Sequence, residues 1–397
     1  MDKAFSLSSD QFKFWHLDFR TGGIRIVLQD GRVIEDELAA QHLPSQTRVA
    51  TSTFDWENWW IWSTTTKDEL ILTEGFNPHS PPPLAGRSSV YLDQNRWRTV
   101  ADTLRDPARV SARSEREAAE FLIDFAEDGG AVLPLSSGHL IETGGLDGER
   151  RHEIGVAMAS LAHGWQLRNP LDLWRSEAEQ SMREYLQIDP VAAPYPIVTE
   201  PGALFGRGTS LAVDTESADY QIFLAMLTMP CVLLDVLIDP ERTEKNPVAK
   251  WVAHHEAITA QIHKENLPKD KRRRLARRRF WNENISLYTT ALRRLTGSHD
   301  VPTVSDAELK KLLGRQPMTG LLSELFVRRF TDHKTRWRRN DLIDLFHLSS
   351  AAAYADYVCA ETHTGTQLQE GQRNLGRPQT VFTTLNDLVT AMKQDGV

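Results

Sequence analysis

Short apolar runs bounded by turn residues fill the first part of the chain, which is the pattern of β-strands. Residues 23–28 and 69–72 are rich in isoleucine, leucine and valine, and Asp30-Gly31 is a hairpin signal shortly after the first run. Consecutive prolines at 81–83 form a stiff linker. The pattern therefore predicts a small β-rich domain over residues 1–86.

Tryptophans at positions 56, 59, 60 and 62 crowd one segment of this domain. A tryptophan cluster can stack on the bases of a nucleic acid, but packing in a core is its commoner use. We expect these rings to lie in the core.

From residue 87 onward, apolar strands alternate with amphipathic helices. Strands are predicted at 88–93 and 131–135, and the apolar residues of 115–127 have helical spacing. Strands that alternate with helices favour a parallel sheet. We expect an α/β domain over residues 87–397, in which a mainly helical, basic insertion occupies about 161–335.

Two helix starts and one ambiguous run complete this pattern. Ser114 with Glu117 has the spacing of a capping box, and Ser136 or Ser137 is the expected N-cap of the helix after the second strand. The apolar run at 232–238 is too short for its periodicity to separate a strand from a buried helical turn. Both interpretations of that run stay open.

The segment 341–348 is apolar on nearly every side of a helix, so it should be packed on most sides. It also carries Asp341 and Asp344, which are one turn apart and about 60° offset around a helix axis. Two buried carboxylates resist ionisation next to each other. Either one of them is protonated, an arginine pairs with them, or a metal ion binds there.

The composition is that of an ordinary soluble protein. The 397 residues are 40% hydrophobic and 25% charged. No run approaches the roughly 18 apolar residues of a membrane span, and the start of the chain lacks the features of a signal peptide, so we expect a cytoplasmic protein without a membrane anchor. Cys231 and Cys359 lie far apart in apolar runs, which favours buried thiols over a disulfide or a zinc site.

The net charge of −8 hides two strongly basic stretches, at 264–279 and 328–339. Such concentrated positive surfaces are typical of proteins that bind a polyanion. A solvated helix face is the ordinary alternative, but Arg272 to Arg279 has no internal acid and so lacks the alternating charges of such faces. The residues expected to contact nucleic acid are Arg272, Arg273, Arg274, Arg277, Arg278, Arg336, Arg338 and Arg339, with Phe280, Trp281 and Trp337 as candidates for stacking on bases.

Acids occupy four positions where an α/β sheet usually places its chemistry. Asp93 and Glu361 each end a predicted strand, and Glu142 and Asp341 lie near the starts of helices. Because ligands of open parallel sheets bind outside the carboxyl ends of the strands, these side chains can converge on one crevice. Carboxylates without histidine or cysteine clusters favour Mg²⁺ or Mn²⁺, and a pair of such ions can clamp the attacking and leaving oxygens of a phosphodiester.

In order and local context, the segments that carry these acids resemble the PIN-like nucleases. The motifs are Val90-Tyr91-Leu92-Asp93, then Val132-Leu133-Pro134-Leu135-Ser136 leading to His139 and Glu142, then Asn340-Asp341 at the start of a helix, and Tyr357-Val358-Cys359-Ala360-Glu361. The resemblance implies a PIN-like parallel sheet flanked by helices. It also implies a metal-dependent endoribonuclease, often a toxin of a toxin–antitoxin pair or an antiviral, phage-defence effector.

Carried over position by position, the resemblance implies that Asp93, Glu142 and Asp341 are metal ligands and that Glu361 occupies the fourth acidic place. The chain between Glu142 and Asp341 is far longer than in compact members of the family, which is why we expect an insertion there.

Three further side chains are candidates around these ligands. Asp344, a catalytic candidate, and His347 continue the acidic helix by successive turns, where they can orient Asp341 or a bound water. His139 lies one turn before Glu142. For both histidines, a place in the core or in a helix cap is the simpler interpretation.

Hydrolysis of RNA phosphodiester bonds is the function that we expect, with the basic segments on the backbone phosphates. Phosphate contacts position a nucleic acid without specifying its sequence, so the charges give no sequence preference. Two alternatives stay open: a non-catalytic nucleic-acid or partner-binding protein whose acidic pocket is degenerate, and a DNA nuclease with the same metal chemistry. An inhibitory protein partner and self-association into a homo-oligomer are also left open.

Overall fold

The computed structural model spans residues 1–397 and describes 11–37, 47–77, 84, 86–206, 232–239, 249–264, 266–298, 303–332, 334, 336–338 and 340–397. Three predictions concern residues outside these ranges. They are the proline linker at 81–83, the buried thiol of Cys231 and the nucleic-acid contact of Arg339.

Two compact units make up the chain, and each is described by itself. The first comprises Met1–Ser89, Trp97–Leu167 and Ile197–Glu244, and the second comprises Val90–Arg96, Arg168–Pro196 and Lys245–Val397. The predicted β-rich domain lies wholly inside the first unit. Its separation from the rest of the chain near residue 86 stays a prediction.

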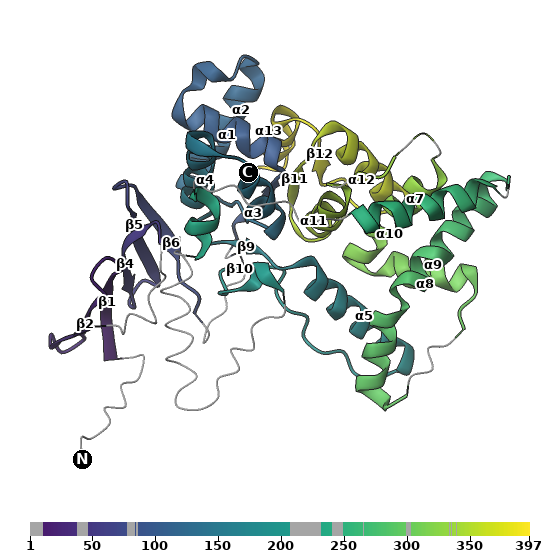
Figure 1. Ribbon diagram of the computed structural model, residues 1–397, viewed down its shortest axis with the longest axis horizontal. Helices are drawn as coiled ribbons and strands as arrows, with labels where there is room; N and C mark the ends of the chain where they lie inside the picture. Colours follow the sequence, from purple (N-terminus) through teal and green to yellow (C-terminus); the bar gives the residue numbers. More distant parts are fainter. Residues whose placement is uncertain are drawn as a thin grey trace. The chain divides into compact units, whose positions relative to one another are not determined.

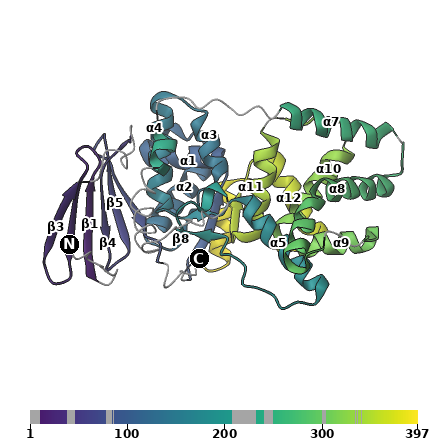
Figure 2. The same ribbon diagram turned by 60° about the horizontal axis from the view of Figure 1, so that its bottom comes forward.

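The first unit contains a six-stranded antiparallel sheet with the strand order β3-β2-β1-β4-β5-β6 (Figures 1 and 2). Buried residues alternate with more exposed ones along β5, as expected when one face of a sheet packs on a core. The predicted β-rich character of this region is therefore confirmed. The strands are β1 (Phe12–Asp18), β2 (Gly23–Leu28), β3 (Val33–Glu37), β4 (Val49–Asp55), β5 (Trp60–Thr65) and β6 (Leu70–Glu74).

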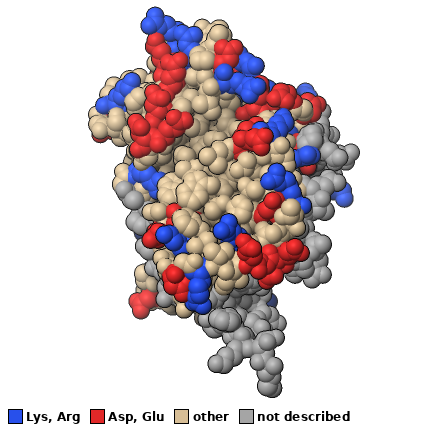
Figure 3. All heavy atoms as spheres, turned by 90° about the vertical axis from the view of Figure 1, so that its left-hand side faces the viewer, with Lys and Arg blue, Asp and Glu red and all other residues tan. Residues whose placement is uncertain are grey.

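Charges of both signs cover the face that is seen from the side of these strands. Acidic and basic side chains are interspersed there among uncharged ones (Figure 3). A face on which charges of both signs are mixed has no strong field of either sign.

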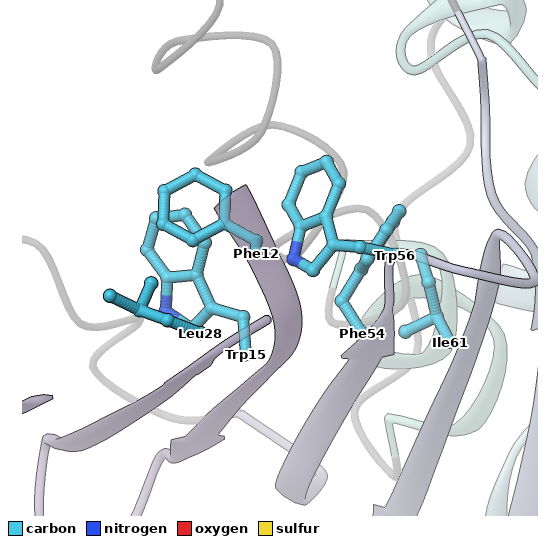
Figure 4. Close-up of a cluster of buried hydrophobic side chains, with 6 residues drawn as sticks. All are labelled: Phe12, Trp15, Leu28, Phe54, Trp56 and Ile61. Carbon is cyan, nitrogen blue, oxygen red and sulfur yellow. The ribbon is translucent and has the colours of Figure 1, made fainter. Parts of the chain in front are cut away.

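Aromatic rings fill the core of the antiparallel sheet. Phe54 and Trp56 have ring centroids 4.1 Å apart, and Trp59 packs against the same cluster. The expectation that the tryptophan cluster packs in a core is thus confirmed for Trp56, which is 6% exposed. The buried cluster consists of Phe12, Trp15, Leu28, Phe54, Trp56 and Ile61 (Figure 4).

A parallel sheet has the strand order β12-β11-β7-β8. In the first unit, Ser88 and Ser89 of β7 (Ser88–Leu92) pair with β8 (Ala131–Val132). In the second unit, the last three residues of β7 pair with β11 (Tyr357–Cys359), and β11 pairs with β12 (Val381–Phe382). All of these pairings are parallel, so the predicted mixed α/β class with a parallel sheet is confirmed.

The second strand of this pattern is shorter than predicted. β8 ends at Val132, because Pro134 has no N–H to donate to a neighbouring strand. Leu135 forms only an isolated parallel bridge to Gln166 of β9 (Gln166–Leu167), which pairs with β10 (Ile197–Val198) in antiparallel fashion.

Helices of the first unit settle two of the sequence predictions. Residues 232–238 are helical, which decides the ambiguous run in favour of a helix. The capping box at Ser114 is wrong, because the helix starts at Arg113 after Ala112 and Ser114 therefore lies inside the first turn. The other helices here are α2 (Arg113–Glu127), α3 (Ser137–Gly144) and α4 (Gly148–Ala162), while α1 (Gln94–Arg105) directly follows Asp93.

The second unit is organised around α10 (Pro317–Thr331), which packs against α5, α7, α8, α9, α11 and α12 (Figure 1). Glu177 caps the start of α10 by accepting hydrogen bonds from the backbone N–H groups of Met318 and Thr319, at 2.6 and 2.8 Å. The neighbours are α5 (Pro170–Leu186), α7 (Ala249–Lys264), α8 (Lys269–Thr296), α9 (Asp306–Arg315), α11 (Asp341–Tyr354) and α12 (Thr362–Asn374), and α13 (Leu385–Gln394) packs on β11 and β12.

Within the described ranges, every helix is too short or too polar to cross a membrane.

Candidate acidic site at the ends of parallel strands

Two of the predicted site residues, Asp93 and Glu361, lie at the same edge of the parallel sheet. Asp93 directly follows β7, and Glu361 follows β11 after Ala360. The Glu361 backbone N–H donates to Asp93 Oδ2 across 2.8 Å, and the Asp93 N–H donates to the carbonyl of Cys359 across 2.9 Å. Both acidic residues are half-buried. The structure therefore brings these two together.

The orientation of the Asp93 carboxylate is fixed by local hydrogen bonds. Its Oδ1 accepts from the backbone N–H of Asn95 across 2.9 Å, as aspartate often does at the start of a helix. Its other oxygen is directed to Glu361. The side chain thus links the start of α1 to the end of β11.

The strand order places this pair at a special point of the sheet. The strand that follows β7 in the chain, β8, lies on one side of β7, whereas β11 lies on the other. Neighbouring strands whose connections leave in opposite directions form a switch point, and open parallel sheets bind ligands outside the carboxyl ends of the strands there. Asp93 and Glu361 end the two strands of that switch point.

Asp341 has a different environment, because an arginine neutralises it. It is the first residue of α11 and is 4% exposed. Its Oδ2 accepts from Arg329 Nη1 and from the Arg338 backbone N–H, each across 2.6 Å. Of the three ways to accommodate a buried acid on this helix, pairing with an arginine is the one that the structure adopts.

The other polar residues of α11 are held within the second unit. Asp344 is half-buried in the first turn. His347 is buried, and burial lowers its pKa to about 4, so its imidazole is neutral near pH 7. A neutral, buried ring matches the simpler interpretation of His347 as a core residue.

Glu142 and His139 belong to the first unit, on α3. Ser136 caps this helix as predicted: its hydroxyl accepts from the His139 N–H at 3.4 Å, and its own N–H donates to His139 Nδ1 at 3.1 Å. The His139 ring is 2% exposed and lies edge-on to Trp97. His139 therefore acts as a capping residue, while Glu142 is half-buried one turn later.

The convergence of all four carboxylates on one metal site stays a prediction. No group of three or more histidine, cysteine, aspartate or glutamate side chains in the described part of the chain is arranged to hold a metal ion. Two carboxylates are a sufficient protein contribution for Mg²⁺, because this ion is usually held by one or two carboxylates, with water and substrate phosphates at its other positions.

Several basic residues of α8 have partners inside the protein. Arg273 and Arg277 both bind the carboxylate of Glu324 on α10, each across 2.8 Å, and Arg278 binds Asp306. Arg272 contacts His263 across 3.3 Å. These four side chains therefore hold helices together, a role that their sequence spacing did not reveal.

Exposed arginines remain at Arg274, Arg336 and Arg338. The last two flank Trp337, which is itself 4% exposed. Phe280 and Trp281 are buried as well, so the prediction that these three rings are available to stack on bases is wrong. Buried aromatic residues next to charged ones are what a helix with one core-facing stripe produces.

One group of polar and aromatic residues was not predicted. Trp174, Trp251, His254, His255 and Glu283 line a cavity in the second unit. These five residues come from three separate helices, α5, α7 and α8, so no spacing along the chain could have indicated that they meet.

Comparisons with known proteins give no relative for this chain: no family model matches it, and no curated protein or solved structure is detectably similar to it.

Proposed function

We propose that the protein is a Mg²⁺- or Mn²⁺-dependent endoribonuclease of the PIN-like kind, with its acidic site centred on Asp93 and Glu361. The observation that carries the proposal is the hydrogen bond from the Glu361 N–H to Asp93 Oδ2, 2.8 Å long. It joins two acids at the carboxyl ends of neighbouring parallel strands. That edge of the sheet is where α/β proteins bind their ligands.

The metal ion would be held by the carboxylates of Asp93 and Glu361, and when bound it would activate a water and neutralise the departing oxyanion. The chain's own contribution is positioning. Because backbone N–H groups fix both oxygens of Asp93, this carboxylate needs no rearrangement to act as a ligand. Asp344 is the further carboxylate of the same unit that we propose for the site, while the role of Glu142 stays a prediction.

The substrate would be held through its phosphates. Arg274, Arg336 and Arg338 are exposed, and an arginine guanidinium binds phosphate oxygens with two parallel hydrogen bonds. Arg336 and Arg338 lie a few residues before α11, the helix that starts with Asp341. RNA is preferred over DNA in this proposal because of the resemblance of the acidic motifs to PIN-like nucleases.

The biological role that suits such an activity is that of a toxin or an antiviral effector in the cytoplasm, restrained by an inhibitory protein. This part of the proposal rests on the resemblance alone. Induced expression of the wild-type protein in a bacterial host is expected to arrest growth, and expression of Asp93→Asn is not. Equal growth of the two cultures would contradict the toxin role.

Cleavage of labelled single-stranded RNA, duplex RNA and single-stranded DNA, with Mg²⁺ or with EDTA, tests the activity. We expect RNA to be cut only with Mg²⁺. Asp93→Asn should lower the rate by more than about 100-fold, because even residues that support a metal ligand contribute 10–100-fold. Asp124→Asn, an exposed acid on α2, is the matched control and should leave the rate unchanged. Cleavage by Asp93→Asn at the wild-type rate would refute the site, and preferential cleavage of DNA would redirect the assignment to a DNA nuclease.

A non-catalytic binding protein is the second candidate, and the ion pair between Arg329 and Asp341 favours it. A carboxylate that is already neutralised by a buried arginine is a poor metal ligand. RNA binding without cleavage under any divalent ion, in the same assay, would support this second candidate.

A further inference from the structure

The cavity lined by Trp174 lies among five helices of the second unit: α5, α7, α8, α10 and α11. Its volume is about 330 Å³, which is near the lower end of the size range of small-molecule pockets. Its lining combines aromatic rings with polar side chains. The proposed nuclease chemistry uses none of these side chains.

Aromatic rings form one part of the lining. Trp174 and Phe326 are buried, whereas Trp251 and Phe346 are half-buried and so keep part of their surface towards the cavity. The ring centroids of Trp174 and Phe346 are 5.4 Å apart, and those of Trp251 and Phe326 are 6.4 Å apart. Such rings offer faces and edges on which a planar ligand can stack.

The protonation of His255 follows from its hydrogen bond. Its Nδ1 lies 2.8 Å from the carbonyl oxygen of Trp251, and since a carbonyl only accepts, Nδ1 carries the hydrogen. Burial lowers the pKa of this imidazole, so the ring is neutral near pH 7. Its Nε2 therefore carries a lone pair and acts as an acceptor.

Two acceptors then face each other among the polar side chains of the lining. His255 Nε2 lies 3.6 Å from Glu283 Oε2. In the neutral imidazole inferred above, Nε2 carries no proton, and an ionised carboxylate only accepts. The other oxygen of Glu283 accepts from His254 Nε2 across 2.7 Å, which holds the carboxylate in place. Asn284 donates its amide group to the carbonyl of Phe280 across 2.7 Å, which makes its Oδ1 the atom that can accept. The polar part of the lining is therefore a set of acceptors that requires N–H donors from a ligand.

We propose that this cavity binds a guanine base. Guanine is planar, it stacks on aromatic rings, and its N1–H and N2–H₂ groups form an adjacent row of donors that matches a carboxylate. Unpaired bases of single-stranded RNA are recognised in this way, by stacking and by hydrogen bonds to the Watson–Crick edge. As a base-recognition site the cavity rests on the proposed action on RNA, and it would give the nuclease a preference for guanosine.

The arginines next to the cavity extend the match from a base to a nucleotide. The Trp337 ring lies 5.2 Å from that of Trp251, in an edge-on arrangement. Arg336 and Arg338 are the exposed neighbours of Trp337 along the chain. They provide the positive charge that a phosphate attached to the bound base would need.

Calorimetric titration of the full chain with guanosine monophosphate, in EDTA so that no cleavage takes place, tests the proposal. Inosine monophosphate lacks the N2 amino group and should bind about tenfold more weakly, and adenosine monophosphate more weakly still. Glu283→Gln replaces one acceptor oxygen by a donor and should weaken the binding of guanosine monophosphate by about tenfold or more. Glu256→Gln, an exposed residue on α7, is the control and should bind like the wild type.

Four results would overturn the guanine site: no binding of guanosine monophosphate, equal binding of the guanosine, inosine and adenosine monophosphates, unchanged binding by a folded Glu283→Gln, or displacement of guanosine monophosphate by N-methylguanidinium at equal concentration. The last result would identify a cation pocket. Asp93→Asn separates this proposal from the proposed function, because it should lower the rate of cleavage by more than about 100-fold and leave the binding of guanosine monophosphate unchanged. Guanine binding by a chain that cuts no RNA would uphold the cavity and refute the nuclease.

Discussion

Arg329 donates a hydrogen bond from Nη1 to Oδ2 of Asp341 across 2.6 Å, and both side chains are almost fully buried. This pair stabilises the start of α11 against the end of α10. It also determines what Asp341 can do. An acid held by a buried arginine contributes first to stability. The acidic chemistry that we propose therefore depends on Asp93 and Glu361, which are half-buried and have no arginine among the contacts described above.

Removal of the arginine should destabilise the protein strongly. Arg329→Met leaves the carboxylate of Asp341 buried without its cation, which costs about 3–5 kcal/mol. The free energy of unfolding in urea measures this loss. Arg336→Met changes an exposed arginine and should stay within about 0.5 kcal/mol of the wild type. Equal stability of the two variants would mean that the buried pair does not form.

The cap of α10 should matter in a similar way. Glu177 accepts from two backbone N–H groups and from the hydroxyls of Thr319 and Tyr354, so Glu177→Gln leaves at least one buried donor without an acceptor. The expected loss is about 1–3 kcal/mol in urea unfolding. The Glu179 carboxylate is partly exposed and pairs with Arg183. Glu179→Gln should therefore lower the free energy of unfolding by less than about 0.5 kcal/mol. A loss of the same size in both variants would rule out the capping role.

His347 should make stability depend on pH. Its pKa is lowered to about 4 in the folded chain, against about 6.5 in the unfolded chain, so between these values the unfolded state binds a proton that the folded state does not. The stabilisation by His347 is fully present above about pH 6.5 and falls as pH drops through this window to about 4, by about 3 kcal/mol in total. His347→Gln should flatten that slope, whereas His363→Gln, at an exposed position, should retain it. Identical slopes in all three proteins would contradict the buried, neutral state of His347.

RNA binding should depend on the exposed arginines and not on the paired ones. Replacement of Arg336 and Arg338 by glutamine should weaken the binding of single-stranded RNA of any sequence. The slope of the logarithm of the binding constant against the logarithm of the salt concentration should become shallower by about 0.7 per arginine, as expected for phosphate contacts. Arg278→Gln is the control, because that guanidinium already binds Asp306 and the carbonyl of Val304. Filter binding at several salt concentrations distinguishes them. Equal losses of RNA affinity in the double variant and the control would mean that Arg336 and Arg338 are not the phosphate contacts.

Local signals in the sequence predicted the parts of the fold that depend on neighbouring residues. The hydroxyl of Ser136 caps a helix because it sits directly before it, and Asp93 and Glu361 meet because each ends a short apolar strand of one parallel sheet. Such patterns are visible along the chain, since strand ends and helix starts are defined by a few consecutive residues.

Contacts between distant helices could not be predicted in this way. Arg273 and Arg277 were expected to bind phosphates, but both bind Glu324, which is far away in the sequence. Asp341 likewise finds its cation on the preceding helix. The periodicity of one helix shows which face is buried, but it does not name the partner on another helix, and the cavity beside Trp174 depends entirely on such partners.

The Mg²⁺ dependence of RNA cleavage, measured side by side for the wild type and Glu361→Gln, tests the central claim most directly. If Asp93 and Glu361 hold the ion together, the Mg²⁺ concentration for half-maximal cleavage should rise at least about tenfold in Glu361→Gln, because one ligand has lost its charge. The same Mg²⁺ dependence in both proteins would contradict a metal site at the ends of β7 and β11.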